Sequence, residues 1–152
     1  MRWNDLKEES CPVARGLSVI GDRWTMMVLR DCFQGIRRFD DFQKRLGITR
    51  HVLADRLRKL EEDGVLERRL YQDRPPRHEY RLTEKGLALL PILVTLIQWA
   101  NTWEPHPEQD DKILRDRETG ARVEPLVVDS ETRQPLTHRT LRRIESSAAP
   151  KA

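Results

Sequence analysis

Cysteine and aromatic residues are scarce in this sequence, and no long apolar run is free of interruption. Only two of the 152 residues are cysteines, Cys11 and Cys32, too few for a disulfide framework or a four-cysteine zinc site. This scarcity predicts a protein of the reducing cytoplasm. The net charge of +3 arises from 28 basic and 25 acidic residues, so composition alone does not identify a polyanionic partner.

Segments typical of export or membrane insertion are also lacking. Residues 1–10 contain no apolar stretch of the signal-peptide kind. The most apolar segment, residues 87–100, is interrupted by Pro91, Thr95 and Gln98 and falls short of the roughly 20 residues that a membrane span requires. We therefore expect no membrane partner.

Common catalytic and cofactor-binding motifs are missing as well. The sequence has no G-x-S-x-G, P-loop, G-x-G-x-x-G or H-E-x-x-H pattern, and its four histidines lack the spacing of metal ligands. We expect no enzyme, no catalytic residues, no metal and no cofactor.

What the sequence does contain is unevenly distributed. Residues 1–104 include 44 hydrophobic residues, whereas residues 105–152 include only 13. Pro105 and Pro107 mark the junction, as is typical of a linker. We predict a packed domain over residues 1–104, a small extension over 105–145 and a disordered tail over 146–152.

The pattern of the first domain predicts a mostly α-helical fold with one small β-hairpin. Helices are expected at residues 12–20, 23–32, 39–45 and 49–63, strands at 65–70 and 77–82, and a long helix at 83–103 with a bend at Pro91. A short helix, a glycine turn, a second helix and a hairpin form the order of a winged helix-turn-helix, whose second helix enters the DNA major groove.

The predicted recognition helix separates a core face from a polar face. Leu53, Leu57 and Leu60 recur with helical spacing and belong to the core. Residues 43–59 carry six basic residues and one acid. The predicted DNA-binding residues near the start and on the polar face of this helix are Thr49, Arg50, His51, Ala54, Asp55 and Arg58.

The hairpin adds Arg74, Arg77 and His78 as predicted contacts to phosphates or the minor groove. Two alternatives remain open. A basic run is often simply a solvated surface, and a winged helix can serve protein contacts without binding DNA.

The last helix of the domain is apolar around almost its whole circumference. One neighbouring face in a domain of about 100 residues cannot cover so much apolar surface, which predicts a homodimer. The alternative is a central core helix in a monomer. The predicted interface residues are Leu90, Leu93, Val94, Ile97 and Ala100.

Spaced motifs between Cys11 and Trp99 resemble the HxlR family of bacterial transcription regulators, relatives of the MarR type. The motifs are Cys11-Pro12-Val13-Ala14-Arg15, Gly21-Asp22-Arg23-Trp24-Thr25, Arg38-Phe39, Leu53, Arg56-Leu57, Leu60-Glu61, Asp63-Gly64, Pro75-Pro76, Glu79-Tyr80-Arg81-Leu82-Thr83 and Gly86. Arg23 stands where lysine is commoner in the family. The resemblance implies a homodimeric regulator that binds an inverted-repeat operator, and we expect it to act as a repressor. The operator and any small-molecule ligand are left undefined.

Cys11 precedes Pro12 and is expected at the start of the first core helix, where the helix dipole favours a thiolate. Some proteins resembling this family sense oxidants or electrophiles through a matching cysteine, which makes Cys11 the candidate sensor. The alternative is an inert capping residue. Cys32 lies in an apolar stretch and is expected to be buried.

Turn signals in residues 113–137 predict a small β-rich extension, followed by a short helix over 138–146. Similar extensions in some family members resemble zinc ribbons. Residues 129–132 and Thr119-Gly120 stand here where a ribbon has cysteines. We hypothesise a ribbon that has lost its metal.

Overall fold

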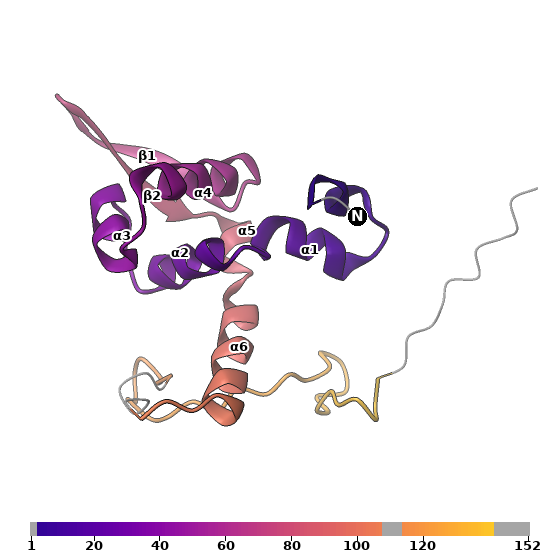
Figure 1. Ribbon diagram of the computed structural model, residues 1–152. Helices are drawn as coiled ribbons and strands as arrows, with labels where there is room; N and C mark the ends of the chain where they lie inside the picture. Colours follow the sequence, from indigo (N-terminus) through magenta and orange to yellow (C-terminus); the bar gives the residue numbers. More distant parts are fainter. Residues whose placement is uncertain (1–2, 108–113, 142–152) are drawn as a thin grey trace, which may run out of the picture. The chain divides into compact units, whose positions relative to one another are not determined.

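The computed structural model describes residues 3–107 and 114–141, which form two units. Contacts divide the chain between Leu93 and Val94, earlier than the proline-rich junction where the sequence predicted a boundary. The first unit contains the helices and the hairpin in the predicted order (Figure 1). The predicted tail, residues 146–152, lies outside the described residues.

The elements of the first unit confirm a mostly α-helical fold with a two-stranded antiparallel hairpin. They are the 3-10 helix η1 (Trp3–Glu8), the helices α1 (Pro12–Ile20), α2 (Arg23–Phe33), α3 (Phe39–Leu46), α4 (Arg50–Glu62) and α5 (Glu84–Leu87), the strands β1 (Leu66–Asp73) and β2 (Pro76–Leu82), and the start of α6 (Leu90–Trp103). The sequence pattern did not predict η1.

Local chemistry explains where the helices begin. Asp22 precedes α2, and its carboxylate accepts hydrogen bonds from the N–H groups of Trp24 and Thr25. Thr49 caps α4 in the same way by accepting from the Val52 N–H. These caps satisfy N–H groups that lack partners within the first helical turn.

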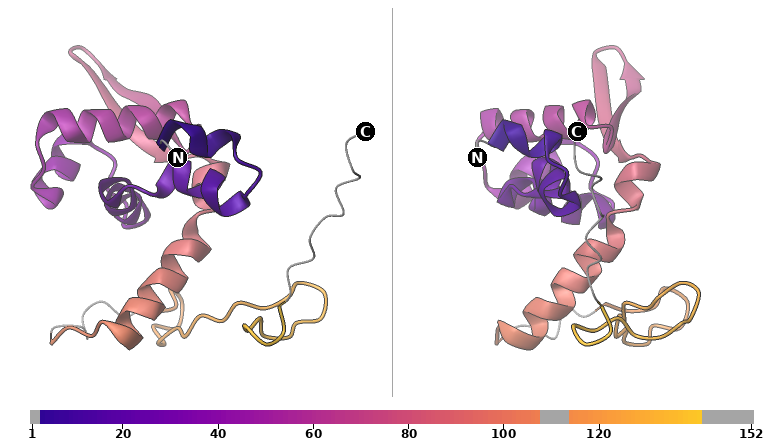
Figure 2. Two further views of the ribbon diagram at one scale, coloured as in Figure 1. Left: turned by 45° about the vertical axis from the view of Figure 1, so that its right-hand side comes forward. Right: turned by 90° about the vertical axis from the view of Figure 1, so that its right-hand side faces the viewer.

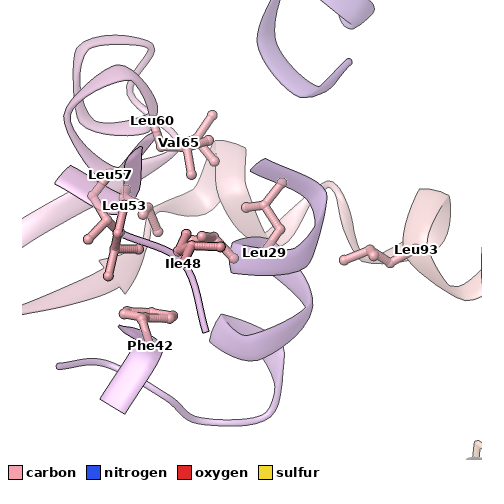
Figure 3. Packing of buried hydrophobic residues seen from close by; sticks show 10 residues of the cluster. Leu29, Phe42, Ile48, Leu53, Leu57, Leu60, Val65 and Leu93 are labelled. Carbon is pink, nitrogen blue, oxygen red and sulfur yellow. The ribbon is translucent and has the colours of Figure 1, made fainter. Parts of the chain in front are cut away.

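The core of the first unit lies where α2, α3, α4 and β1 meet. Figure 3 shows Leu53, Leu57 and Leu60 of α4 among the buried side chains of this cluster. All three are fully buried, as their spacing predicted. Phe42 of α3 and Leu29 of α2 are also fully buried, so the core fixes both helices beside α4.

One buried side chain of α2 is charged, although the sequence pattern predicted an apolar helix. The Asp31 carboxylate is fully buried and lies 2.7 Å from an Arg30 nitrogen and 3.4 Å from the Arg45 Nε. A buried carboxylate is costly unless paired. The ion pair with Arg45 therefore links α2 to the end of α3.

The strands are longer than predicted and leave a tighter connection between them. Leu66 pairs with Leu82 and Asp73 with Pro76, and the register shifts between Leu70 and Gln72. The hairpin, called the wing below, projects beyond the helices of its unit in both views of Figure 2.

The predicted long C-terminal helix is interrupted. α5 ends at Leu87 and α6 begins at Leu90, so the break precedes Pro91 instead of being a bend at it. A proline ring clashes with the carbonyl four residues earlier, here that of Leu87, which explains the position of the break. By length and composition alone, the 20 residues Glu84–Trp103 could cross a membrane. Gly86 and Leu93 are the residues of this segment that are buried in the chain, and the others are half-buried or exposed.

The second unit is not β-rich in its described part. It contains isolated bridges between Arg115 and Arg122 and between Val128 and Pro135, each closing a tight turn. Residues 138–140 form a turn, and the rest of the predicted helix, from residue 142, lies outside the described residues. Most backbone hydrogen bonds of this segment join residues that are close in sequence, so the segment forms turns in place of the expected strands.

Candidate nucleic-acid interface

The start of α4 presents several of the predicted DNA-binding residues to solvent. Gly47 has a φ of 64°, a left-handed conformation that suits glycine and sharply turns the chain between α3 and α4. Thr49, His51 and Ala54 are exposed, opposite the buried leucines. The geometry is that of a helix-turn-helix with an open outer face.

Arg50 is held in place by side chains of α3. Its guanidinium donates to the Asp40 Oδ1 at 3.0 Å and to the Gln43 Oε1 at 3.1 Å, and it lies 4.6 Å from the centre of the Phe39 ring. The Arg50 side chain remains 67% exposed. It is therefore oriented by α3 and still accessible to a ligand.

These α3 contacts were not predicted from the sequence. Asp40 and Gln43 were not among the candidate residues, because nothing in the spacing connects them to Arg50. The only available signal was the position of α3 directly before the turn.

Asp55 and Arg58 form an ion-paired network on the same face. Arg58 also bridges to Glu62, with a nitrogen-to-oxygen distance of 2.8 Å. Hydrogen bonds from its guanidinium to Glu62 and then to Asp55 raise the pKa of Arg58 above its usual value. Arg58 is therefore cationic but already has carboxylate partners.

Acidic partners compensate much of the positive charge counted in residues 43–59. Besides Arg50 and Arg58, the paired bases are Arg45 with Asp31, Arg56 with Asp22 and Lys59 with Asp63. Asp31, Asp22 and Asp63 all lie outside the counted window, as do Asp40 and Glu62, so the sequence count overstated the local excess. The ion pairs of Arg50 and Arg58 are exposed and therefore weak, so phosphates can compete for these two arginines.

The three predicted DNA-binding residues of the wing lie in two places, beside α4 and at the tip of the hairpin. Arg77 and His78 are exposed on β2 and line a hollow of about 420 Å3 together with Arg50. Arg74 lies at the tip of the hairpin and does not line this hollow. The structure thus brings Arg77 and His78 to the recognition helix and leaves Arg74 apart.

The base of the wing is attached to the segment before α3. The Tyr80 N–H donates to the Arg37 carbonyl oxygen at 2.7 Å, and the Arg38 guanidinium lies 4.6 Å from the centre of the Tyr71 ring. Arg38 and Tyr71 also line the hollow, and the sequence reasoning had not assigned them to the site. The wing and the helix-turn-helix therefore form one continuous surface.

The two cysteines lie in different environments. Cys11 is exposed and precedes α1, as predicted. Cys32 is half-buried against the core, and its burial, with a smaller effect of Asp31, raises the pKa of Cys32 to about 12. Cys32 therefore remains a neutral thiol at physiological pH.

The residues predicted for a dimer interface differ in exposure. Leu90 is 44% exposed, and Val94, Ile97 and Ala100 are half-buried. Leu93 is only 6% exposed because it belongs to the core of its own chain, which corrects its assignment to the interface. The large apolar side chains most exposed on α6 are instead Leu90, Ile92, Leu96, Trp99 and Trp103.

Histidine, cysteine and acidic side chains are the usual metal ligands in proteins. Within residues 3–107 and 114–141, no three of them lie in a suitable arrangement. The described residues therefore offer no ligand set for a metal ion.

Comparison with known proteins identifies similar sequences and structures. A family model described as HxlR-like helix-turn-helix matches residues 19–108. The uncharacterized HTH-type transcriptional regulator Rv3095 of Mycobacterium tuberculosis is 40% identical over 129 residues, covering 85% of this chain and 82% of that protein.

Solved structures are similar over different lengths. PA1607, described as a candidate transcription factor, is 40% identical with a TM-score of 0.82, covering 92% of this chain and 98% of that one. The redox regulator HypR in its reduced form is 36% identical with a TM-score of 0.57, covering 60% of this chain and 92% of its own. The similarity to HypR is thus confined to a smaller part of the chain.

Proposed function

Because the chain belongs to the HxlR family of helix-turn-helix transcription regulators, we propose that it is a homodimeric repressor of an inverted-repeat operator. In this proposal α4 enters the major groove, and the wing contacts phosphates or the minor groove. The observation that carries it is the hollow that Arg50 shares with Arg77 and His78. Such a protein works in the cytoplasm, where the DNA is.

Arg50 is proposed to read bases, since the contacts with Asp40, Gln43 and Phe39 orient its guanidinium before DNA binds. An oriented side chain loses less conformational entropy on binding. Thr49, His51, Ala54, Asp55 and Arg58 complete the proposed face of α4, and Arg74 is proposed to contact a phosphate.

The test begins with selection of bound sites from genomic DNA, followed by affinity measurements on the selected operator. We expect Arg50→Ala to change which bases are tolerated and Arg74→Ala to weaken binding to all sequences alike. Arg115→Ala in the second unit is the matched control and should leave binding unchanged. A reversed pattern for the first two variants would contradict the proposed register.

Salt dependence distinguishes this function from a winged helix used only for protein contacts. About six to ten phosphate contacts would weaken binding roughly 10³- to 10⁵-fold between 50 and 200 mM salt. An apolar protein interface lacks this dependence. In transcription from a promoter overlapping the operator, the protein should reduce transcript yield, and an increase would exclude repression.

The proposed dimer interface lies on α6, where large apolar side chains are exposed. It includes Leu90, Val94, Ile97 and Ala100 together with Leu96 and Trp99, which are 47% and 55% exposed. Exposed apolar surface of this extent is typical of an interaction site. Two-fold symmetry would place two copies of α4 on successive major grooves.

Sedimentation of Leu96→Asp and Trp99→Asp tests this interface. We expect both variants to be monomeric and the control Leu126→Asp, at an exposed leucine beyond α6, to remain dimeric. A monomeric parent protein, or dimers of both α6 variants, would contradict the proposal.

Cys11 is proposed to couple operator binding to oxidants. It is exposed at the start of α1, and the similar protein HypR is a redox regulator. The Cys11 thiolate would attack one oxygen of hydrogen peroxide, breaking the O–O bond to give a sulfenic acid and hydroxide, which is protonated to water. Peroxide should change operator affinity in the parent and in Cys32→Ser, but not in Cys11→Ser. A peroxide response in Cys11→Ser would contradict the proposal.

The extension is proposed to be a metal-free counterpart of a zinc ribbon. Asp116 accepts hydrogen bonds from the N–H groups two and three residues later, and Asp129 does the same. Gly120 and Arg133, four residues after each aspartate, both have a φ near 60–70°. Elemental analysis should find no zinc in the purified protein, and one zinc per chain would overturn the proposal.

A further inference from the structure

A hollow of about 460 Å3 lies under α1, in the first unit and away from the residues proposed to bind DNA. Its apolar lining comes from Val19, Ile20, Val65 and Leu89, which pack in or against the core. Binding sites for small organic molecules typically have this size and an apolar lining with a few polar groups. We call it the α1 hollow.

The polar part of the lining consists of Ser18, three basic side chains and one acid. The bases are Lys7 of η1, Arg15 of α1 and Lys85 of α5, and the acid is Asp63. Asp63 is paired with Lys7 and also with Lys59, which lies outside this lining. Lys7 and Lys59 together neutralise the Asp63 carboxylate. The lining of the hollow therefore carries a net positive charge, with three bases and one acid.

From this combination we propose that the α1 hollow binds a small aromatic carboxylate. An apolar ring would lie against Val19, Ile20 and Leu89, and its carboxylate would accept hydrogen bonds from Lys85 and Lys7. The Lys7 side chain is 53% exposed, so its ammonium group is accessible to a bound anion. A cation or a neutral polar molecule would lack this charge complementarity.

The α1 hollow also adjoins the elements that carry the proposed function. The Lys85 Nζ donates to the Asp63 carbonyl oxygen at 2.6 Å, and the Thr83 hydroxyl donates to the Gly64 carbonyl oxygen at 2.6 Å. These bonds connect the end of α4 to the start of α5. A bound carboxylate competes for Lys85 and so alters this connection, and its effect on operator affinity rests on the proposed function.

Calorimetry with 2-naphthoate and its neutral analogue 2-naphthamide tests the site on the full chain. We expect the carboxylate to bind at least about tenfold more tightly, the value of one hydrogen bond to a charged group. Equal binding of the two compounds, or no binding of naphthoate at millimolar concentration, overturns the proposal.

Two variants locate the binding to the α1 hollow. A Cβ atom added at Gly16 meets nothing within 4 Å, so Gly16→Leu fills the hollow without a clash at its Cβ and should abolish naphthoate binding. Lys85→Gln should weaken it about tenfold. Lys44→Gln, which removes an equal charge elsewhere, is the control. Unchanged binding in Gly16→Leu, with its thermal unfolding like that of the parent, contradicts the site.

Operator affinity with and without naphthoate then tests the coupling. We expect naphthoate to change the affinity of the parent protein but not that of Gly16→Leu. Failure to bind any operator without naphthoate contradicts the proposed function, whereas the calorimetric result concerns the ligand site alone. An operator affinity that naphthoate leaves unchanged, despite binding, rejects the coupling.

Discussion

Ten hydrophobic side chains are buried between Val28 and Leu93, whereas none is buried among the described residues from 94 to 141. The first unit is stabilised by its apolar core. Hydrogen bonds to Asp116 and Asp129 form the turns of the second unit, which leaves Leu126 67% and Leu141 61% exposed. Local hydrogen bonds can shape a segment without burying it, so apolar side chains of the second unit stay exposed.

The largest expected effect follows from truncation of a core side chain in the first unit. Leu57 is fully buried on α4, and Leu57→Ala should lower the free energy of unfolding by about 3 to 4 kcal/mol because it leaves a cavity. Urea unfolding followed by circular dichroism measures the change. The same truncation at exposed Leu126 should change stability by less than about 0.5 kcal/mol. If Leu57→Ala and Leu126→Ala lowered the free energy of unfolding equally, the proposed difference in packing between the two units would be wrong.

Two glycines sharpen the contrast within the first unit itself. A Cβ atom at Gly86 would lie 2.3 Å from the Val65 carbonyl oxygen and 2.9 Å from the Leu82 Cδ2 atom. Gly86→Ala should therefore destabilise the protein by about 2 to 3 kcal/mol. A Cβ atom at Gly16, inside α1, has no neighbour within 4 Å, so Gly16→Ala should stabilise the protein by about 0.5 to 1 kcal/mol. Thermal unfolding of both variants should show shifts of opposite sign, and a loss in both would contradict this packing.

A smaller effect is expected at Asp63, where the first unit depends on charge. Burial tends to raise the pKa of Asp63, but hydrogen bonds from Lys7 and Lys59 outweigh it and hold the pKa below its ordinary 3.8. Asp63→Asn should cost about 1 to 2 kcal/mol at pH 7. Because the folded pKa is depressed, this stabilisation is complete above pH 3.8 and is lost as the pH falls through the lower value.

Unfolding of the parent and of Asp63→Asn at pH 7 and at about pH 2 measures this dependence. The difference between the two proteins should shrink at the lower pH. Glu131→Gln, an exposed acid of the second unit, is the control and should have little effect at either pH. A difference for Asp63→Asn that stays constant with pH would show that the carboxylate charge is not its source.

Regular spacing explains which parts of the fold could be predicted. The leucines of α4 and the turn at Gly47 are local features, so the sequence indicated both the helix and its buried face. The sequence predicted a bend at Pro91, whereas the helix breaks before it. The close approach of Gly86 to Val65 in α5 joins residues far apart in the sequence and could not be read from the spacing. The strands were underestimated, since their pairing continues to Asp73 and Pro76 at the tip.

The candidate site was predictable only in part, because local spacing indicates exposed positions but not contacts between elements. The exposed face of α4, with Arg50, follows from the spacing of its leucines, and Arg77 and His78 were predicted as basic residues of the hairpin. The partners of Arg50 could not be inferred, because Asp40 and Gln43 approach it only after α3 packs beside α4. Leu93 was misplaced because an all-apolar helix has no pattern that separates its core side from its exposed side.

Motifs and their spacing along the chain were enough to predict the family, the order of the elements and the buried face of α4. Which charges are compensated depends instead on how the helices pack. Arg45, Arg56 and Lys59 meet Asp31, Asp22 and Asp63, acids that a count over residues 43–59 cannot include. The α1 hollow also emerged only from packing, since Lys7, Arg15 and Lys85 come from three separate elements. Electrostatic interactions depend on distance in space, and folding sets that distance.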